Sequence, residues 1–360
     1  MLNNNLLIQG ENLQALQRLA KNYANKIDLI YIDPPFNSNQ IFYCSSQKNN
    51  SISKCGNGQI AYIDKFTLRE FLEFLKERLV LLRELLSEQG SLYLHIDDKM
   101  SHYVKIVMDE IFGIQNFKND ITRIKCNPKN FERSAYGNEK DVILFYSKNS
   151  KKNIWNEIRL PLNEQELENS FKKIDKNGRR YNTVPCHAPG ETQNGETAKE
   201  WMGLKPPLGR HWRYSPVELT KLQDQGLIEW SKTGVPRIIK YADEHIGKKV
   251  QDVWIYKDPQ NPRYPTQKNL DMLKFIVSQS SNTSSIVLDC FAGSGTTLEA
   301  TTALNRKWIG IDNSKIAIDI IKQMLLKQNI DYEFMDYSSP EDNSKIAVYA
   351  SLKQLEMELN

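Results

Sequence analysis

The stretch "KIDLIYIDPPFNSNQ", residues 26–40, shows how the chain begins its sheet and where it places its first functional group. Residues 27–32 form an almost continuous apolar run, which is typical of a strand buried on both faces of a parallel sheet. Asp33 follows directly, and Pro34 and Pro35 then fix the backbone and remove two hydrogen-bond donors. The pattern predicts a rigid cluster of acceptors at the end of a buried strand, with the ring of Phe36 beside it.

Strand and helix patterns alternate on the carboxyl-terminal side of this stretch. Residues 67–90 predict a long amphipathic helix, with Thr67 as N-cap, Glu70 three residues later and Gly90 as the stop. A strand over 91–97, a helix over 99–111 and a strand over 141–148 follow. This alternation predicts an α/β fold built on a doubly wound, mostly parallel sheet.

The regular alternation stops near residue 150 and returns near residue 269, and proline and glycine are frequent between them. We therefore expect a first part of the main domain over 1–150, an inserted domain over 151–262 and a second part over 263–360. The insert holds 19 Lys and Arg against 15 Asp and Glu, whereas the two sets balance in the remainder. It also holds five of the six tryptophans. These features are compatible with a nucleic-acid surface, and a loop-rich insertion stays open as the alternative.

Bulk composition excludes several classes of protein. The five cysteines form no CxxC pair, which favours a reduced, cytosolic chain with neither a disulfide framework nor a zinc site. No apolar run is long enough for a signal peptide or a membrane-spanning helix, so we expect no membrane partner.

A second functional stretch is "SSIVLDCFAGSGTTLEA", residues 284–300, which reads as a strand, a glycine turn and the start of a helix. Its small residues let a ligand approach the backbone, and the absence of a lysine after the glycines excludes a phosphate-binding P-loop. Asp312 ends the next strand, 19 residues beyond Gly293, where an acid can accept hydrogen bonds from ribose hydroxyls. The pair fits an adenosine-bearing cofactor, with a purely structural turn as the alternative.

Seven strings in a fixed order carry a family resemblance: DPPF at 33–36, SLYLHIDD at 91–98, DVILFYSK at 141–148, GRHWRYSP at 209–216, YPTQK at 264–268, LDCFAGSGTT at 288–297 and WIGID at 308–312. In this order the sequence resembles the amino-group DNA methyltransferases of the β arrangement. These have a Rossmann-like methyltransferase fold with a circularly permuted motif order, because the Asp-Pro-Pro motif precedes the recognition domain and the cofactor turn comes last. The strings at 209–216 and 264–268 resemble in particular the modification subunits of type III restriction systems.

The resemblance implies transfer of a methyl group from S-adenosyl-L-methionine to N6 of an adenine flipped out of double-stranded DNA. The Asp33 carboxylate and the Pro34 carbonyl would accept the amino N–H groups, Pro35 would hold the turn and Phe36 would stack on the base. The sulfonium is already activated, so neither a metal nor a covalent nucleophile is expected. The cofactor residues that the resemblance implies are Lys268, Asp289, Phe291, Ala292, Gly293, Ser294, Gly295, Thr296 and Asp312.

The resemblance also implies partners and a location. Double-stranded DNA is the expected partner, and a homodimer and a restriction endonuclease partner are open expectations. The expected location is the bacterial cytoplasm, at the nucleoid through DNA. Three positions depart from the family pattern: Cys290 and Asn269 stand where proline is usual, and Glu11 stands where aspartate is usual.

Other readings of the same residues stay open. Methylation of cytosine N4 uses the same chemistry, and the enzymes that perform it usually have serine at the position of Asp33. The aspartate here therefore favours adenine. Methylation of cytosine C5 needs a cysteine after a proline, and Cys186 follows Pro185, though inside the insert. A protein glutamine methyltransferase would carry its Asn-Pro-Pro-Tyr motif after the glycine turn. The chain could also belong to another functional class, as a DNA-recognition subunit that no longer methylates.

Several further residues have two interpretations each. In the insert, Trp201, Arg210, Trp212, Arg213 and Tyr214 are expected close to DNA, with the domain core as the alternative for the two tryptophans. Lys125, Lys129 and Arg133 are candidates for phosphate contacts or for a solvated loop. His95 is expected to be a packed residue at a strand end rather than a base.

Overall fold

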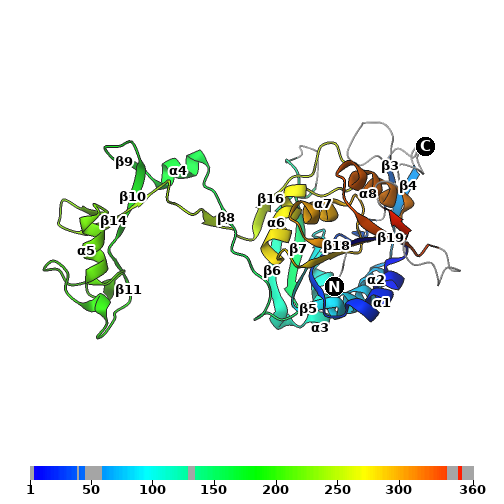
Figure 1. The fold of residues 1–360 in the computed structure, drawn as a ribbon, viewed down its shortest axis with the longest axis horizontal. Helices are drawn as coiled ribbons and strands as arrows, with labels where there is room; N and C mark the ends of the chain where they lie inside the picture. The colour runs from blue at the N-terminus through cyan, green and yellow to red at the C-terminus, as the bar shows by residue number, and fades with distance from the viewer. Residues whose placement is uncertain (1–3, 39, 45–58, 129–133, 339–347, 351–360) are drawn as a thin grey trace. The chain divides into compact units, whose positions relative to one another are not determined.

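The computed structural model describes residues 4–38, 40–44, 59–128, 134–338 and 348–350 (Figure 1). The chain divides into two compact units: unit 1 comprises Met1–Ile158 and Gln251–Asn360, and unit 2 comprises Arg159–Val250. Unit 2 lies inside the range 151–262 expected for the insert, and the two ends of that range belong to unit 1. There β16 (Val253–Ile255) pairs in parallel with β6 (Phe117–Ile124), and the Asn156 amide donates to the carbonyl of Ser281 at 2.9 Å.

Unit 1 is built on a ten-stranded sheet in the order β16-β6-β7-β5-β2-β17-β18-β1-β19-β20. Neighbouring strands are parallel except where β7 meets β5 and β6 and where β20 meets β19. The predicted mostly parallel α/β sheet is therefore confirmed. The remaining strands are β1 (Asn5–Gln9), β2 (Ile27–Ile32), β5 (Leu86–Ile96), β7 (Lys140–Ser147), β17 (Ile286–Asp289), β18 (Lys307–Asp312), β19 (Tyr332–Asp336) and β20 (Val348–Ala350).

Helices cover the two faces of this sheet, and Figure 1 shows α1, α2 and α3 on one side with α6, α7 and α8 on the other. Leu79 of α2 packs in one core cluster with Ile30, whereas Leu298 of α7 packs in another with Trp308. The helices are α1 (Asn12–Tyr23), α2 (Leu68–Leu85), α3 (Ser101–Phe112), α6 (Leu270–Ser280), α7 (Thr296–Ala303) and α8 (Lys315–Lys327), with a short 3-10 turn η1 (Ile114–Asn116) and a separate hairpin β3 (Gln40–Cys44) and β4 (Gln59–Asp64).

The direction of winding reverses between β2 and β17. β2 leads through α2 to β5 on one side, and β17 leads through α7 to β18 on the other. The two strands are neighbours, with Leu29 opposite Val287 and Ile30 opposite Leu288. Because their carboxyl ends meet at this switch point, the segments after β2 and β17 face a common crevice, where ligands bind in open α/β sheets.

Helix α2 begins as predicted and ends early. Thr67 accepts a hydrogen bond from the backbone of Glu70, whose side chain caps Thr67 in return, so the capping box is confirmed. The helix stops at Leu85 rather than near Gly90, and this part of the prediction was wrong. The Lys26 N–H donates to the Leu85 carbonyl at 3.0 Å and Leu86 pairs with Ile27, so pairing with β2 competes with the last helical turn.

Unit 2 has a core of its own. A four-stranded sheet, ordered β13-β14-β10-β9, packs with α5 around Trp201, Trp212, Leu219 and Ile238. The two tryptophans are 3% and 2% exposed, so the structure supports the core alternative for both. The elements are β8 (Arg159–Leu160), α4 (Glu164–Ser170), β9 (Lys173–Ile174), β10 (Arg180–Pro185), β11 (His187–Pro189), η2 (Glu196–Ala198), β12 (Arg210–Trp212), α5 (Pro216–Asp224), β13 (Ile228–Trp230), β14 (Pro236–Tyr241) and β15 (Lys248–Lys249).

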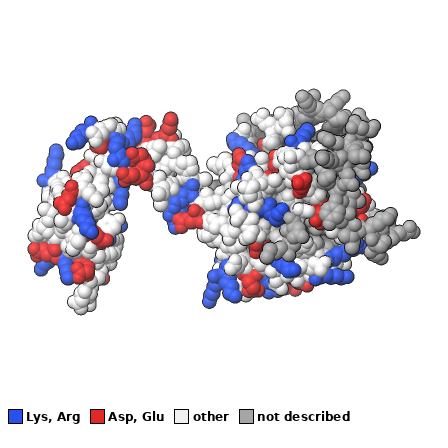
Figure 2. All heavy atoms as spheres, viewed as in Figure 1, with Lys and Arg blue, Asp and Glu red and all other residues white. Residues whose placement is uncertain are grey.

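Charges are mixed on both units. Figure 2 shows Lys and Arg side chains interspersed with Asp and Glu over the visible face of each. Among the helices that the structure describes, none has the length and apolar character needed to span a bilayer.

Candidate active site

The segment after β2 forms one wall of a cavity. Asp33 comes directly after Ile32, and its side chain is 17% exposed. Beyond Phe36, the carboxylate of Asp64 accepts hydrogen bonds from the backbone of Asn37 at 2.8 Å and of Ser38 at 2.7 Å. Asp64 is buried at the end of β4, so a distant strand fixes the exit of the diproline segment. Sequence reasoning missed this anchor, which lies 27 residues from Asn37.

The glycine turn after β17 forms the facing wall. The Gly293 N–H donates to the Asp312 carboxylate at 2.7 Å, which ties the turn to the end of β18. Gly293 and Gly295 both have positive φ, at 50° and 75°. A Cβ at Gly295 would lie 2.8 Å from Cγ1 of Ile321 in α8, so only glycine fits here without movement of the helix.

Two carboxylates lie beside the glycine turn, of which Asp289 is buried and Asp312 is partly buried. Burial raises the pKa of Asp289 to about 7, with a further contribution from the charges of Asp33 and Asp312. The Phe291 N–H donates to Asp289 at 3.0 Å, which partly offsets this rise. Burial also raises the pKa of Asp312. A cluster of acids in a desolvated position favours a cationic ligand, which would relieve their mutual repulsion.

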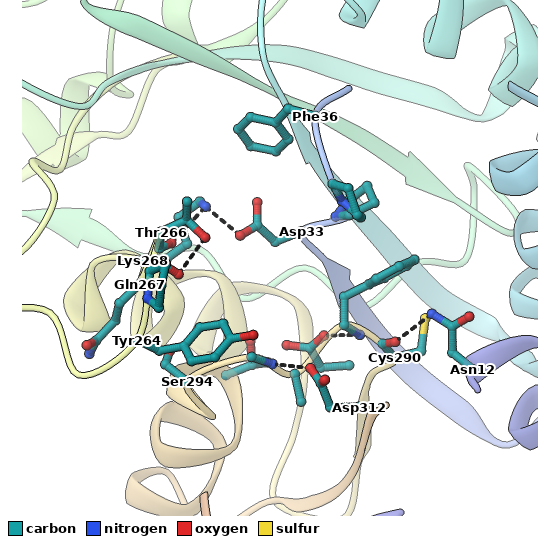
Figure 3. A pocket seen from close by; sticks show the side chains of 18 of the residues that line it. Asn12, Asp33, Phe36, Tyr264, Thr266, Gln267, Lys268, Cys290, Ser294 and Asp312 are labelled. Atoms are coloured by element: carbon teal, nitrogen blue, oxygen red, sulfur yellow. Dashed lines mark hydrogen bonds and ion pairs between the residues drawn. The ribbon is translucent and has the colours of Figure 1, made fainter. Parts of the chain in front are cut away.

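Lys268 pairs with Asp33 across the cavity (Figure 3). Its ammonium donates to Oδ2 of Asp33 and, at 3.1 Å, to the carbonyl of Thr266, and its side chain is only 7% exposed. The other carboxylate oxygen, Oδ1 of Asp33, is buried and has no hydrogen-bond partner among the residues that the structure describes. The ammonium also lies 5.2 Å from the ring centre of Phe36. One oxygen of the carboxylate is therefore paired, and the other is unpaired within the described chain.

These walls enclose a cavity of about 250 Å³. It brings together all the residues that the sequence assigned to catalysis and cofactor binding except Gly295, which supports the turn from behind. The predicted residues that line it are Asp33, Pro34, Pro35, Phe36, Lys268, Asp289, Phe291, Ala292, Gly293, Ser294, Thr296 and Asp312. Lining residues that sequence reasoning missed include Asn12, Tyr31, Asp64, Phe74 and Tyr264.

The positions that depart from the family pattern have structural roles. Glu11 caps α1, accepting from the Gln14 N–H at 3.0 Å, and pairs with buried Arg78 at 2.5 Å. Asn269 caps α6 by accepting from the Met272 N–H at 3.0 Å. Cys290 is buried, which raises the pKa of its thiol well above its usual range.

A buried polar network lies behind Phe36. His95 bonds to the Tyr31 hydroxyl at 2.8 Å and to Asp141 at 3.2 Å, and its ring packs 5.9 Å from that of Phe36. Burial lowers the pKa of His95, so the ring is neutral at physiological pH. This is the packed strand-end residue expected from the sequence.

Lys125 belongs to the same network. Its ammonium pairs at 2.6 Å with Asp141, whose pKa is held low, against the effect of burial, by His95 and Lys125. The ion pair with a nearly buried carboxylate weakens the case for a phosphate contact through Lys125, and that contact stays a prediction. Lys129 and Arg133, named with it, lie outside the described residues.

Cys186 does not have the environment of a nucleophile. It is fully buried in the core of unit 2, and burial raises the pKa of its thiol to about 11. A reactive cysteine needs an accessible, stabilised thiolate, so the structure argues against the cytosine C5 reading. Over the described part of the chain, no group of three or more His, Cys, Asp or Glu side chains is placed to hold a metal ion.

Comparison with known proteins agrees with this geometry. The family model described as DNA methylase matches residues 27–323. The chain is 41% identical to the type II methyltransferase M.EcaI of Enterobacter cloacae, over 87% of this chain and 67% of that protein. It is 28% identical to the Mod subunit of the type III restriction-modification enzyme StyLTI of Salmonella typhimurium, over 84% of this chain and 50% of that subunit.

Among solved structures, the M1.HpyAVI–SAM complex aligns with 89% of this chain and 100% of its own, at 17% identity and a TM-score of 0.45. The family match covers both the Asp33 segment and the glycine turn, which lie on the two walls of the cavity. On the strength of that match, this chain belongs to the DNA methylase family.

Proposed function

We propose that this chain is a modification methyltransferase that transfers a methyl group from S-adenosyl-L-methionine to N6 of an adenine in double-stranded DNA. The observation that carries the proposal is that Asp33 lines the cavity from a rigid diproline corner opposite the glycine turn, with its Oδ1 unpaired among the described residues. Family membership supports the reaction class, and the similarity to M.EcaI and to the Mod subunit of StyLTI supports a place in a restriction-modification system.

The cavity fits the proposed cofactor. The left-handed glycines leave room beside the turn, and the acids Asp289 and Asp312 favour a cation. Asp312 accepts from the N–H groups of Gly293 and Ser314, and a carboxylate has about four acceptor sites, so capacity remains for ribose hydroxyls. When bound, the cofactor supplies a methyl group already activated on a sulfonium. Holding it would fall to the glycine turn, Asp289 and Asp312.

The Asp33 segment would hold the base. The lone pair of an exocyclic amino nitrogen is conjugated with the ring, which makes it a weak nucleophile. Oδ1 of Asp33 and the carbonyl of Pro34 would accept its N–H groups and so favour a geometry in which the lone pair is free to react. Phe36 presents an apolar face for stacking, and Lys268 would hold the carboxylate in its orientation.

The expected base is adenine because Asp33, and not serine, opens the motif. N4 of cytosine is the competing acceptor, since its amino group has the same chemistry. Unit 2 is proposed as the target recognition domain, with duplex DNA as its partner.

The test is methyl transfer by the purified chain to unmethylated bacterial DNA, followed by hydrolysis and mass spectrometry of the nucleosides. We expect N6-methyldeoxyadenosine, and no product from the Asp33→Asn variant. N4-methyldeoxycytidine instead would correct the acceptor, and a folded chain that binds DNA but yields neither would point to a recognition subunit. Single-molecule sequencing of DNA from cells that express the chain would then give the target sequence.

A further inference from the structure

Unit 2 carries an exposed apolar side chain at the end of a two-stranded ribbon. The ribbon pairs β11 with β12 in antiparallel register, and we call residues 187–191 together with residues 205–213 the ribbon tip. Leu208, in the connection that precedes β12, is 97% exposed. Single exposed leucines are common, so exposure alone assigns it no role.

The backbone around Leu208 is stiff. Pro206 and Pro207 precede it, and the Arg210 N–H closes the turn on the Pro207 carbonyl at 3.0 Å. The Gly190 N–H donates to the Gly209 carbonyl at 3.0 Å, and the Gly209 N–H donates to the Glu191 carboxylate at 2.9 Å. The leucine is therefore presented on a fixed support, and little conformational entropy would be lost when it meets a partner.

Two arginines of the ribbon tip lack carboxylate partners, and the one carboxylate of the tip, Glu191, accepts from the Gly209 N–H instead. Arg210 and Arg213 are exposed, and within residues 159–250 neither forms an ion pair. Arg210 bonds instead to the ring of His187 at 3.2 Å, and Arg213 to the carbonyl of Pro185 at 3.0 Å. Elsewhere in unit 2, Arg179 pairs with Asp243 and Glu244 at 2.8 Å. Unneutralised arginines beside a fixed apolar tip are an arrangement suited to a polyanion.

We propose that the ribbon tip enters duplex DNA, with Leu208 inserted between base pairs and Arg210 and Arg213 on the flanking phosphates. The inference rests on the proposed function and assigns part of the DNA contact to particular residues. A leucine has no group that can hydrogen-bond to a base edge, so it contributes by unstacking neighbouring base pairs or by filling the gap that an extruded base leaves. Guanidinium groups nearby hold the backbone in register.

The charge of the ribbon tip favours DNA over a second copy of the chain as its binding partner. A protein partner would have to supply carboxylates for both arginines, whereas DNA carries phosphates along its whole length. A second copy is therefore the outcome that the experiment must exclude.

Ile246 provides a matched control. It is an exposed apolar residue of unit 2 at 74%, between β14 and β15. The ribbon is tied to the start of β14, where the Cys186 N–H donates to the Pro236 carbonyl at 3.3 Å. Ile246 instead follows the opposite end of β14, after Tyr241.

The experiment uses the full chain, unmethylated plasmid DNA and no cofactor, so that it does not depend on methyl transfer. Permanganate oxidises thymines that are unstacked, and primer extension maps them. We expect localised reactive thymines with the wild type and with Ile246→Ala, and about tenfold lower reactivity with Leu208→Ala at saturating protein. Arg210→Gln should reduce the slope of log affinity against log salt by about one, measured by filter retention on the same plasmid.

Reactivity with Leu208→Ala equal to the wild type would overturn the proposal, as would a bound wild type that leaves all thymines protected. A change in sedimentation of Leu208→Ala with unchanged DNA reactivity would identify a second copy as the occupant and also overturn it. Reactive thymines without any methylation by the wild type would contradict the proposed function alone. Methylation without reactive thymines would contradict only the role of Leu208.

Discussion

Lys268 forms an ion pair with Oδ2 of Asp33 and leaves Oδ1 of the same carboxylate buried, with no partner in the described part of the chain. The two residues are 235 positions apart in the sequence and meet at the switch point of the sheet. An ion pair on one oxygen limits the rotation of the carboxylate. The unpaired oxygen is then held in one orientation on a residue that lines the cavity, where the proposed reaction needs an acceptor.

Replacing Asp33 by asparagine should stop methyl transfer with little change in ligand binding. The amide keeps the size of the side chain but removes one acceptor, so we expect kcat to fall by about a hundredfold or more. Steady-state methylation assays and calorimetric titration of the cofactor would measure the two effects. The control is Asp120→Asn, which changes an exposed acid of β6. If Asp33→Asn keeps activity within about tenfold of the wild type, the assigned role of Asp33 is contradicted.

The variant Lys268→Gln separates two roles for the lysine. The family resemblance implies that Lys268 lies near the methionine carboxylate of the cofactor, whereas the structure pairs it with Asp33. If it positions Asp33, kcat should fall about tenfold while KM for the cofactor stays nearly constant.

A rise in KM for the cofactor at unchanged kcat would instead support the contact with the methionine carboxylate. Lys257→Gln is the matched control, because this lysine is exposed and its ammonium donates to the Asn127 side chain at 2.6 Å.

Asp289 should make stability depend on pH. Burial raises its pKa in the folded chain to about 7, so the folded state binds a proton more tightly than the unfolded state does. Its contribution to the free energy of unfolding is complete below the unfolded pKa, about 4, and is lost as pH rises through about 7.

Urea unfolding of the wild type and of Asp289→Asn between these limits would measure this dependence. The variant lacks the titrating group, so its stability relative to the wild type should increase with pH across this window. A difference that stays constant with pH would show that the carboxyl group does not titrate there.

Gly295→Ala should destabilise unit 1 more than Gly293→Ala does. Both positions have positive φ, so both substitutions carry backbone strain of about 1–2 kcal/mol. Only at Gly295 would the new methyl group clash, at 2.8 Å from Ile321, whereas at Gly293 the nearest atom is 3.6 Å away on Tyr264. Thermal unfolding would compare them, and equal losses would mean that α8 shifts without cost.

Local sequence patterns predicted the elements that position the site. The apolar run at 27–32 is a strand with the predicted bounds, and Thr67 starts α2 with the predicted cap. The end of α2 was not predictable, because pairing of Leu86 with Ile27 competes with the helix. That pairing joins segments about 60 residues apart, and no pattern within the helix encodes it.

The sequence by itself determined the mostly parallel α/β sheet, the diproline corner and the glycine turn, because periodicity and turn chemistry act between neighbouring residues. Only the tertiary structure decided that Lys268 binds Asp33, that Asp64 anchors the residues after Phe36, and that Trp212 lies in a core. These contacts join residues from distant elements, and their partners are chosen when the sheet and its helices pack. The physical reason is that burial and ion pairing depend on which surfaces meet in space.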